Sequence, residues 1–218
     1  MVFQDRAEAG RVLASRLLHF KGRGDVVVLA LPRGGVPVGF EVARELGAPL
    51  DVFIVRKLGT PGQPELAMGA IASGVLVLNE DVVAVLGIPE EVIESVAARE
   101  RQEIERRERE YRGERPAFEV ENRTVILVDD GLATGSSMRA GARALREKHP
   151  AWLAVAVPVA ARATCEDLKQ EVDEVVCAVT PESFAAVGQW YREFPQTTDE
   201  EVRELLQRAG NQQQVRAA

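Results

Sequence analysis

Two adjacent carboxylates, Asp129 and Asp130, stand where a ligand site is expected in this 218-residue chain. They follow the apolar run 125–128, whose β-branched residues predict a strand buried on both faces of a parallel sheet. Open α/β sheets bind their ligands at the carboxyl ends of such strands. The small residues of 131–137 come next and predict a loop that runs into a helix.

Such a loop presents main-chain N–H groups, and the helix N-terminus behind it adds a partial positive charge, so together they suit a phosphate. The two carboxylates suit sugar hydroxyls or a cation on the same ligand. This combination predicts a phosphorylated sugar. The alternative is a solvated acidic turn at the end of a strand.

A second loop of the same design lies earlier in the chain. The apolar run 26–31 predicts another buried strand, and Pro32, Arg33, Gly34 and Gly35 follow it, with Pro37 opening a helix. Taken alone, this stretch is explained as well by a tight turn. Paired with the acidic site, it predicts a second anion site.

The acidic motif resembles that of the type I phosphoribosyltransferases, which has four apolar residues, two acids and a short loop ending in Thr-Gly. The resemblance implies that Asp129 and Asp130 contact the ribose hydroxyls of phosphoribosyl pyrophosphate. The 5-phosphate would lie against Ala133, Thr134, Gly135, Ser136 and Ser137. The pyrophosphate would lie against Arg33, Gly34 and Gly35, in a loop where the family often has a non-proline cis peptide.

The implied reaction is the displacement of pyrophosphate from carbon 1 of the donor by a nitrogen acceptor such as a nucleobase. Magnesium would be held mainly by the substrate, with Asp129 and Asp130 as protein ligands. The 6-oxopurine enzymes carry an aspartate where this chain has Ala133, so the loop is most like the adenine type. A regulator that senses the donor without catalysis is the alternative. A dinucleotide-binding oxidoreductase is disfavoured, since no GxGxxG loop follows a strand.

Two basic residues follow the next predicted strand, residues 51–55. Arg56 and Lys57 would stand beside the pyrophosphate loop, where cations neutralise a leaving diphosphate, although simple solvation would also explain them. Together with the two carboxylates, they complete the predicted catalytic set. Residues 56–70 are rich in Gly and Pro and predict a long loop. With a hairpin around Ser73 and Gly74, we expect a flexible flap over residues 56–79.

The remaining periodicity predicts a doubly wound and mostly parallel α/β sheet flanked by helices. The resemblance implies that residues 1–218 form one phosphoribosyltransferase domain. Residues 89–112 predict a long, charged and exposed helix, which could contact a second copy in a homodimer.

The aromatic segment 180–196 predicts core packing or a small C-terminal hood, in which Trp190 and Tyr191 would cap the acceptor. Residues 211–218 predict a disordered tail.

The composition of the chain bears on where the protein is located and on which classes of partner it binds. A net charge of −7 argues against a nonspecific nucleic-acid binder. The two cysteines, Cys165 and Cys177, lack metal-site spacing and predict reduced thiols in a cytoplasmic protein. No apolar run approaches the length of a membrane span, so we expect no membrane partner.

Overall fold

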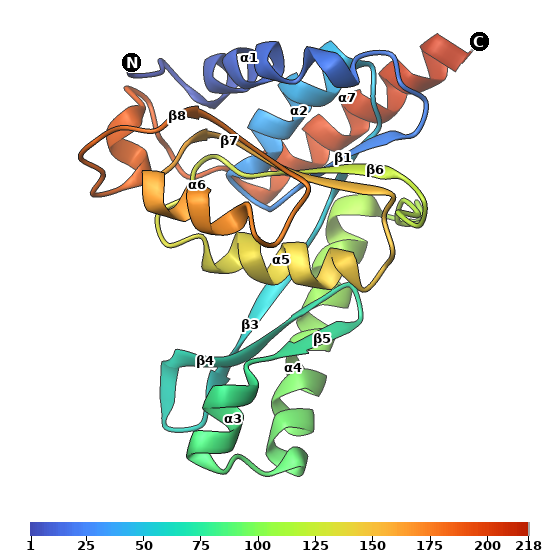
Figure 1. Cartoon of the computed structure of the whole chain (residues 1–218). Coiled ribbons are helices and arrows are strands. Elements are labelled where there is room, and N and C mark those ends of the chain that lie inside the picture. The colour runs from blue at the N-terminus through green and yellow to red at the C-terminus, as the bar shows by residue number, and fades with distance from the viewer. Residues whose placement is uncertain (218) are drawn as a thin grey trace.

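A five-stranded parallel sheet forms the centre of the computed structural model, which describes residues 1–217 (Figure 1). Its strand order is β2-β1-β6-β7-β8, and every neighbouring pair is parallel. The strands are β1 (Val26–Ala30), β2 (Leu50–Val52), β6 (Thr124–Val128), β7 (Trp152–Val159) and β8 (Glu174–Val179). β1 and β6 are buried along their whole length, as their unbroken apolar runs predict.

Helices cover both faces of this sheet, which confirms the predicted doubly wound architecture (Figure 1). Val26 and Val28 of β1 pack with α1 (Arg6–Arg16), α2 (Gly35–Leu46) and α7 (Asp199–Ala217). The alternate residues Val27 and Leu29 pack on the opposite face with α5 (Ser136–Arg146) and α6 (Arg162–Leu168). Successive side chains of a strand point to opposite faces of the sheet, so β1 contributes residues to the hydrophobic layers on both faces.

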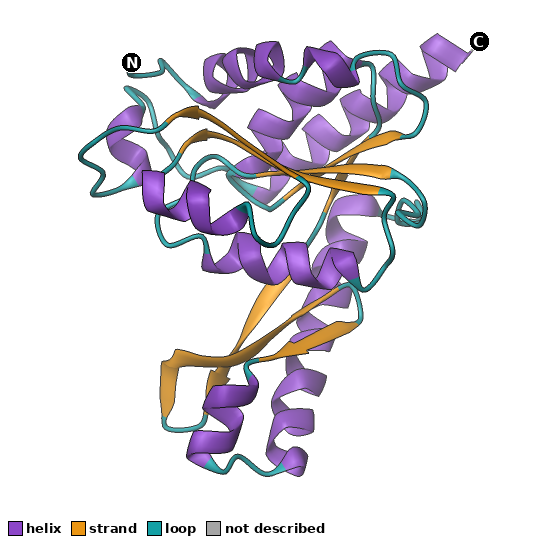
Figure 2. Ribbon diagram, viewed as in Figure 1, coloured by secondary structure: helices purple, strands orange, loops and turns teal. Residues whose placement is uncertain are grey.

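A second sheet, three-stranded and antiparallel, extends from the main body (Figure 2). It comprises β3 (Val55–Thr60), β4 (Gln63–Ala72) and β5 (Val75–Leu78), next to α3 (Glu80–Leu86) and α4 (Glu90–Arg112). The turn at Ser73 and Gly74 confirms the expected hairpin, and α4 confirms the expected long helix.

Two boundary predictions in this region were wrong. Residues 56–70 are a hairpin instead of a long loop, because Pro61 and Gly62 form a tight turn, with Gly62 at φ 79°, between two paired strands. The strand predicted over residues 51–55 ends at Val52, and β3 starts anew at Val55. Arg56 therefore lies inside a strand of the smaller sheet and does not mark the carboxyl end of the main one.

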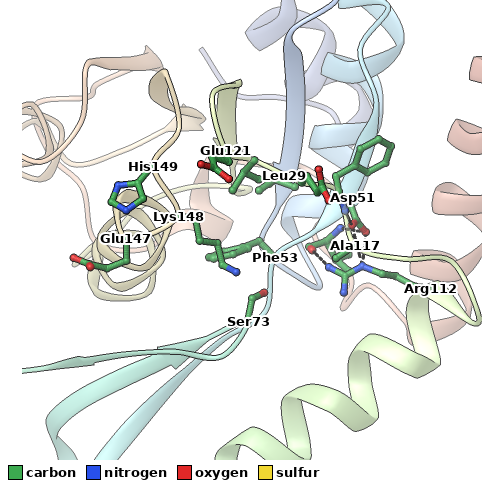
Figure 3. Close-up of a pocket in the computed structure, with 14 residues that line it drawn as sticks. Leu29, Asp51, Phe53, Ser73, Arg112, Ala117, Glu121, Glu147, Lys148 and His149 are labelled. Atoms are coloured by element: carbon green, nitrogen blue, oxygen red, sulfur yellow. Dashed lines mark hydrogen bonds and ion pairs between the residues drawn. The ribbon is translucent and has the colours of Figure 1, made fainter.

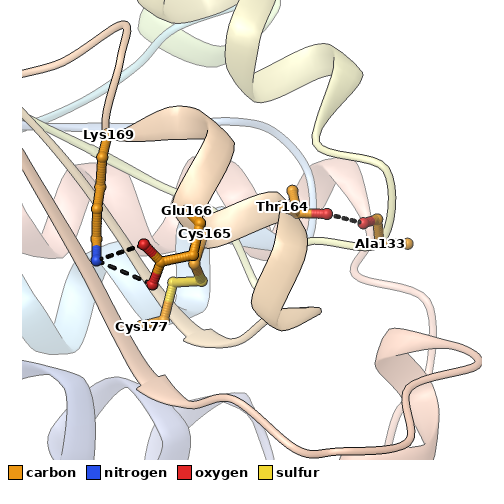
Figure 4. Close-up of a disulfide and its surroundings, with 6 residues drawn as sticks. All are labelled: Ala133, Thr164, Cys165, Glu166, Lys169 and Cys177. Atoms are coloured by element: carbon orange, nitrogen blue, oxygen red, sulfur yellow. Dashed lines mark hydrogen bonds and ion pairs between the residues drawn. A yellow bond between two sulfur atoms is a disulfide. The ribbon is translucent and has the colours of Figure 1, made fainter.

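The structure also differs from the sequence predictions at the chain's C-terminal end. α7 continues through residues 211–217, where a disordered tail was predicted, and Ala218 lies outside the described residues. Cys165 of α6 and Cys177 of β8 form a disulfide, with their Cα atoms 6.8 Å apart, where free thiols were predicted (Figure 4). Spacing along the chain could not reveal this pair, because only the packing of α6 on β8 brings the two residues together. None of the described helices is both long and apolar enough to span a membrane.

The N-terminal residues pair with the aromatic segment that follows β8. Phe3 N donates to Trp190 O at 2.8 Å, and Arg192 N donates to Phe3 O at 2.9 Å. Phe3 and Tyr191 are both buried, with ring centroids 5.6 Å apart. The N-terminus and the predicted hood are thus one layer beside the central sheet.

Candidate functional site

The two predicted loops meet at the carboxyl edge of the central sheet, where β1 and β6 lie side by side. Ala30 pairs with Val128 at the ends of these strands, and Leu31 N donates to Val128 O at 2.9 Å. The chain then turns through Pro32 and Arg33 into α2, and the peptide bond between these two residues is cis. The parallel pairing of the strands is what brings two loops so far apart in the sequence into one site.

Gly34 and Gly35 let the first loop approach the carboxylates closely. A Cβ atom on Gly34 would lie 2.1 Å from Asp130 Oδ2, and one on Gly35 would lie 2.8 Å from Val128 O and 2.9 Å from Asp129 Cα. No side chain fits at either distance. Both glycines are therefore required by contact with the acidic motif, a signal that the sequence alone could not separate from an ordinary turn.

Each carboxylate of the acidic pair uses one oxygen within the protein. Asp129 Oδ1 accepts from Asp130 N at 2.8 Å, and Asp130 Oδ2 accepts from Arg6 Nε at 2.8 Å. Among the described residues, Asp129 Oδ2 and Asp130 Oδ1 accept no hydrogen bond. One acceptor oxygen on each of two adjacent carboxylates suits two neighbouring hydroxyls.

The ionisation of this pair is perturbed by its surroundings. Burial, and then the charge of Asp130, raise the pKa of Asp129 well above the usual aspartate range. Burial also raises the pKa of Asp130, and the hydrogen bond from Arg6 opposes that shift. Perturbed carboxyl groups of this kind are typical of functional sites.

The loop of residues 131–135 leads into α5, and within it Leu132 N donates to Val159 O at 2.9 Å. In the described part of the chain, the N–H groups of residues 133–137 donate no hydrogen bond. Gly135, at φ 69°, adopts the left-handed conformation that turns the chain into the helix. Ala133, Thr134 and Ser137 are exposed. Unpaired amides at a helix N-terminus form an anion site.

A threonine of α6 supports this loop from outside. Thr164 Oγ1 donates to Ala133 O at 2.7 Å, next to the disulfide at Cys165 (Figure 4). Its methyl carbon would lie 2.6 Å from a Cβ atom on Gly135. Sequence reasoning missed Thr164, because its part depends on the packing of α6.

Arg6, the first residue of α1, is the second site residue that the sequence did not reveal. Besides its bond to Asp130, its Nη1 donates to Pro195 O at 2.7 Å, and its guanidinium carbon lies 3.8 Å from the centroid of the Phe194 ring. Both side chains of the ion pair are largely buried, with 11% of Arg6 and 15% of Asp130 exposed. Nothing in its local sequence distinguishes Arg6 from other helix-surface arginines.

The predicted cap residues lie in the same layer. Tyr191 is buried, and its hydroxyl donates to the main-chain oxygen of Asp130. Trp190 is half-buried, and its indole Nε1 is buried without a partner among the described residues. Tyr191 thus contacts the acidic motif through its main chain, and Trp190 packs against the cluster that includes Phe3 and Val159.

The predicted cations do not all lie together. Arg33 is half-buried and lies 3.5 Å from the Asp199 carboxylate. Arg56 donates to Glu100 Oε2 of α4 at 2.8 Å. Lys57 is exposed and lines a cavity of about 370 Å³ with Ser136 and other residues of α5 and the smaller sheet. Among the described residues, neither Arg56 nor Lys57 forms an ion pair or a hydrogen bond with the Arg33 loop.

The site has few ligands to offer a metal ion. Within the described residues, no group of three or more His, Cys, Asp or Glu side chains is arranged to hold one. Asp129 and Asp130 offer one unpaired oxygen each. This donor set fits Mg²⁺ only if substrate and water supply most of its ligands, which is how this ion is commonly bound.

A cavity of about 540 Å³ lies elsewhere, between the edge of the main sheet and the turn of the smaller sheet (Figure 3). Its lining includes Phe53, Ser73 and Lys148, and a buried ion pair between Asp51 and Arg112 forms part of its wall. None of the residues of the two loops lines it.

Comparisons with known proteins agree with this geometry. A family model described as a phosphoribosyl transferase domain matches residues 4–192. Two Mycobacterium tuberculosis proteins, from strains CDC 1551 / Oshkosh and ATCC 25618 / H37Rv, are each 46% identical to this chain over 209 residues and carry the name "Putative phosphoribosyl transferase". These alignments cover 95% of this chain and 47% of each relative, so the chain spans about half the length of the curated relatives it matches.

A solved structure is similar along almost the whole chain. The crystal structure of TT1426 from Thermus thermophilus is 45% identical and superposes with a TM-score of 0.84, covering 94% of this chain and 98% of that one. Together with the family match over residues 4–192, this likeness shows that the chain belongs to the phosphoribosyl transferase domain family.

Proposed function

We propose that this chain transfers the 5-phosphoribosyl group from phosphoribosyl pyrophosphate to a nitrogen acceptor, with release of pyrophosphate. The observation that carries the proposal is the meeting of two anion loops around a pair of carboxylates with one unpaired oxygen each. Carboxylate acceptors suit the ribose hydroxyls, and an anion loop on each side suits the two phosphate ends of one donor molecule.

Each part of the site then has a distinct role. The amides of residues 133–137, with the hydroxyls of Thr134, Ser136 and Ser137, hold the 5-phosphate. Asp129 and Asp130 accept from the ribose hydroxyls and position carbon 1, while the Arg33 loop holds the pyrophosphate. Holding both ends of the donor fixes the reacting carbon, and cationic groups stabilise the departing diphosphate. Mg²⁺ bound with the substrate would supply further charge neutralisation.

The smaller sheet supplies the proposed flap, over residues 56–79. In the structure, Lys57 lines a cavity beside α5, and Arg56 is paired with Glu100 of α4. Closure of the smaller sheet over the site would bring these two cations nearer the diphosphate. A homodimer and a cytoplasmic location stay predictions.

The acceptor is proposed to be a nucleobase, capped by the segment with Trp190 and Tyr191. Support comes from the hydrogen bond that the Tyr191 hydroxyl donates to the main-chain oxygen of Asp130, which joins this segment to the acidic motif. We predict that Trp190→Ala raises the KM for the acceptor more than the KM for the donor. Equal changes in both, or loss of stability alone, would assign Trp190 to the core.

The direct test is pyrophosphate release from phosphoribosyl pyrophosphate with Mg²⁺ across a panel of purine and pyrimidine bases. We expect release with at least one base, and its loss in Asp130→Asn, whose neutral amide lacks the negative charge and one of the two acceptor oxygens of the carboxylate. Donor affinity should fall roughly tenfold or more in this variant, since hydrogen bonds to charged groups contribute about 1.5–3 kcal/mol. Asp81→Asn, at an exposed site on α3, is the matched control.

Three other outcomes are informative. Unchanged donor affinity in Asp130→Asn would contradict the site. Tight Mg²⁺-dependent donor binding without release across the panel would indicate a sensor of the donor. Absence of donor binding by the wild type would contradict the proposed function.

A further inference from the structure

We propose that Arg6 is a positioning residue of the donor site, which fixes the carboxylate of Asp130 so that one chosen oxygen faces the ribose. This assignment rests on the proposed function, because it concerns how the same site prepares Asp130 for a hydroxyl. It gives the N-terminal helix a part in donor binding.

The main chain of Arg6 is fixed by its position at the start of α1. Asp5 caps the helix by accepting from Glu8 N at 2.7 Å, which sets Arg6 as the first helical residue. From there its guanidinium makes three contacts, with Asp130 Oδ2 at 2.8 Å, with Pro195 O at 2.7 Å, and with the face of the Phe194 ring at 3.8 Å. A side chain held at three points loses little further freedom when the donor binds.

The contact selects one oxygen of Asp130. Oδ2 accepts from Arg6 Nε at 2.8 Å, and a Cβ atom added to Gly34 would lie 2.1 Å from the same oxygen. Oδ1 is left without a hydrogen bond among the described residues. Among the described residues, the other charged or titratable groups that face Asp130 are Asp129 beside it and Tyr191, whose hydroxyl donates to the main-chain oxygen of Asp130. Arg6 is thus the cation that neutralises and orients this carboxylate.

A purely structural role, tying the N-terminus to the C-terminal segment, does not account for the contact. Main-chain hydrogen bonds already join these segments, from Phe3 to Trp190, from Arg192 to Phe3 and from Glu193 to Gln4. The largely buried ion pair with Asp130 instead adds a charge-assisted bond at the ligand edge of the sheet.

The guanidinium geometry predicts that lysine is an incomplete substitute. Arg6 uses two different nitrogens for Asp130 and Pro195 and its flat face for Phe194. An ammonium has the charge but neither the fork nor the planar face. Arg6→Lys should therefore keep the fold and lose part of the donor affinity.

The test is calorimetric titration of phosphoribosyl pyrophosphate with Mg²⁺ into the wild type, Arg6→Gln, Arg6→Lys and the control Arg11→Gln. Arg11 lies on the same helix, is exposed and forms no ion pair among the described residues. We expect Kd to rise at least about tenfold in Arg6→Gln, to rise by a smaller factor of about three or more in Arg6→Lys, and to stay within about twofold in Arg11→Gln. Thermal melting identifies any variant that fails to fold.

The outcomes separate this assignment from the function on which it rests. Donor binding by the wild type together with equal Kd values for folded Arg6→Gln and Arg11→Gln would overturn the role of Arg6 alone. If Arg6→Gln does not fold, Arg6→Lys decides, and a wild-type Kd for that variant would overturn the role. A wild type that does not bind the donor would contradict the proposed function itself.

Discussion

Gly34 has no room for a side chain next to the carboxylate of Asp130. Gly34 has φ −60° and ψ −31°, values that any residue adopts, so its backbone conformation does not require glycine. The requirement comes instead from Asp130 Oδ2, 2.1 Å from where a Cβ atom would be. At this point the two loops share one small space, and a change in either loop alters the other.

We predict that Gly34→Ala displaces the Asp130 carboxylate and weakens donor binding about tenfold or more. Overpacking at such a contact costs about 1–3 kcal/mol of unfolding free energy, so the fold should survive. Gly24→Ala is the control, because a Cβ atom there meets nothing within 4 Å. Calorimetry with phosphoribosyl pyrophosphate and thermal melting measure the two effects, and an unaltered donor affinity in a folded Gly34→Ala would show that the loops are not coupled.

At the scale of elements, α6 supports the proposed phosphate loop that precedes α5. Thr164, near the start of α6, bonds to Ala133 O, and Cys165 next to it is joined to β8 by the disulfide. The main chain of the loop is thereby held at Ala133. A fixed anion loop loses less entropy when it binds a phosphate.

We predict that Thr164→Val weakens donor binding a few-fold, because it removes a hydrogen bond with a net contribution of about 1 kcal/mol while keeping the methyl group near Gly135. Thr164→Ser keeps the hydroxyl and should bind the donor like the wild type. Inhibition of pyrophosphate release by inorganic phosphate, compared between the two variants, reports on the loop itself. If Thr164→Val retains wild-type values, the contact with Ala133 has no part in holding the loop.

The sequence predicts the elements with strong local signals. The unbroken apolar runs of β1 and β6 identify buried parallel strands, and the charged four-residue spacing identifies α4. Residues 56–70 were misjudged because Gly and Pro dominate a segment whose strand character comes from pairing across the hairpin, which local composition does not encode. The tail predicted over residues 211–218 was wrong for a different reason: its polar residues show no apolar period, yet α7 continues through residues 211–217.

Across the whole molecule, the two acidic residues and both glycines could be found from motif spacing, but their partners could not. Arg6 reaches Asp130 across 124 positions, and Tyr191 reaches it across 61. The same is true of the buried ion pair between Asp51 and Arg112, which joins β2 to the end of α4. Contacts of this kind depend on the order of the strands in the sheet, and that order is established only when the whole sheet is assembled.

The measurement that tests the account most directly is a crystal structure of the protein with phosphoribosyl pyrophosphate and Mg²⁺. The account predicts the 5-phosphate against the amides of residues 133–137, the ribose hydroxyls on Asp129 Oδ2 and Asp130 Oδ1, and the pyrophosphate against Arg33, Gly34 and Gly35. A donor bound in the cavity beside Phe53, or bound at this edge without contact to either carboxylate, would contradict it.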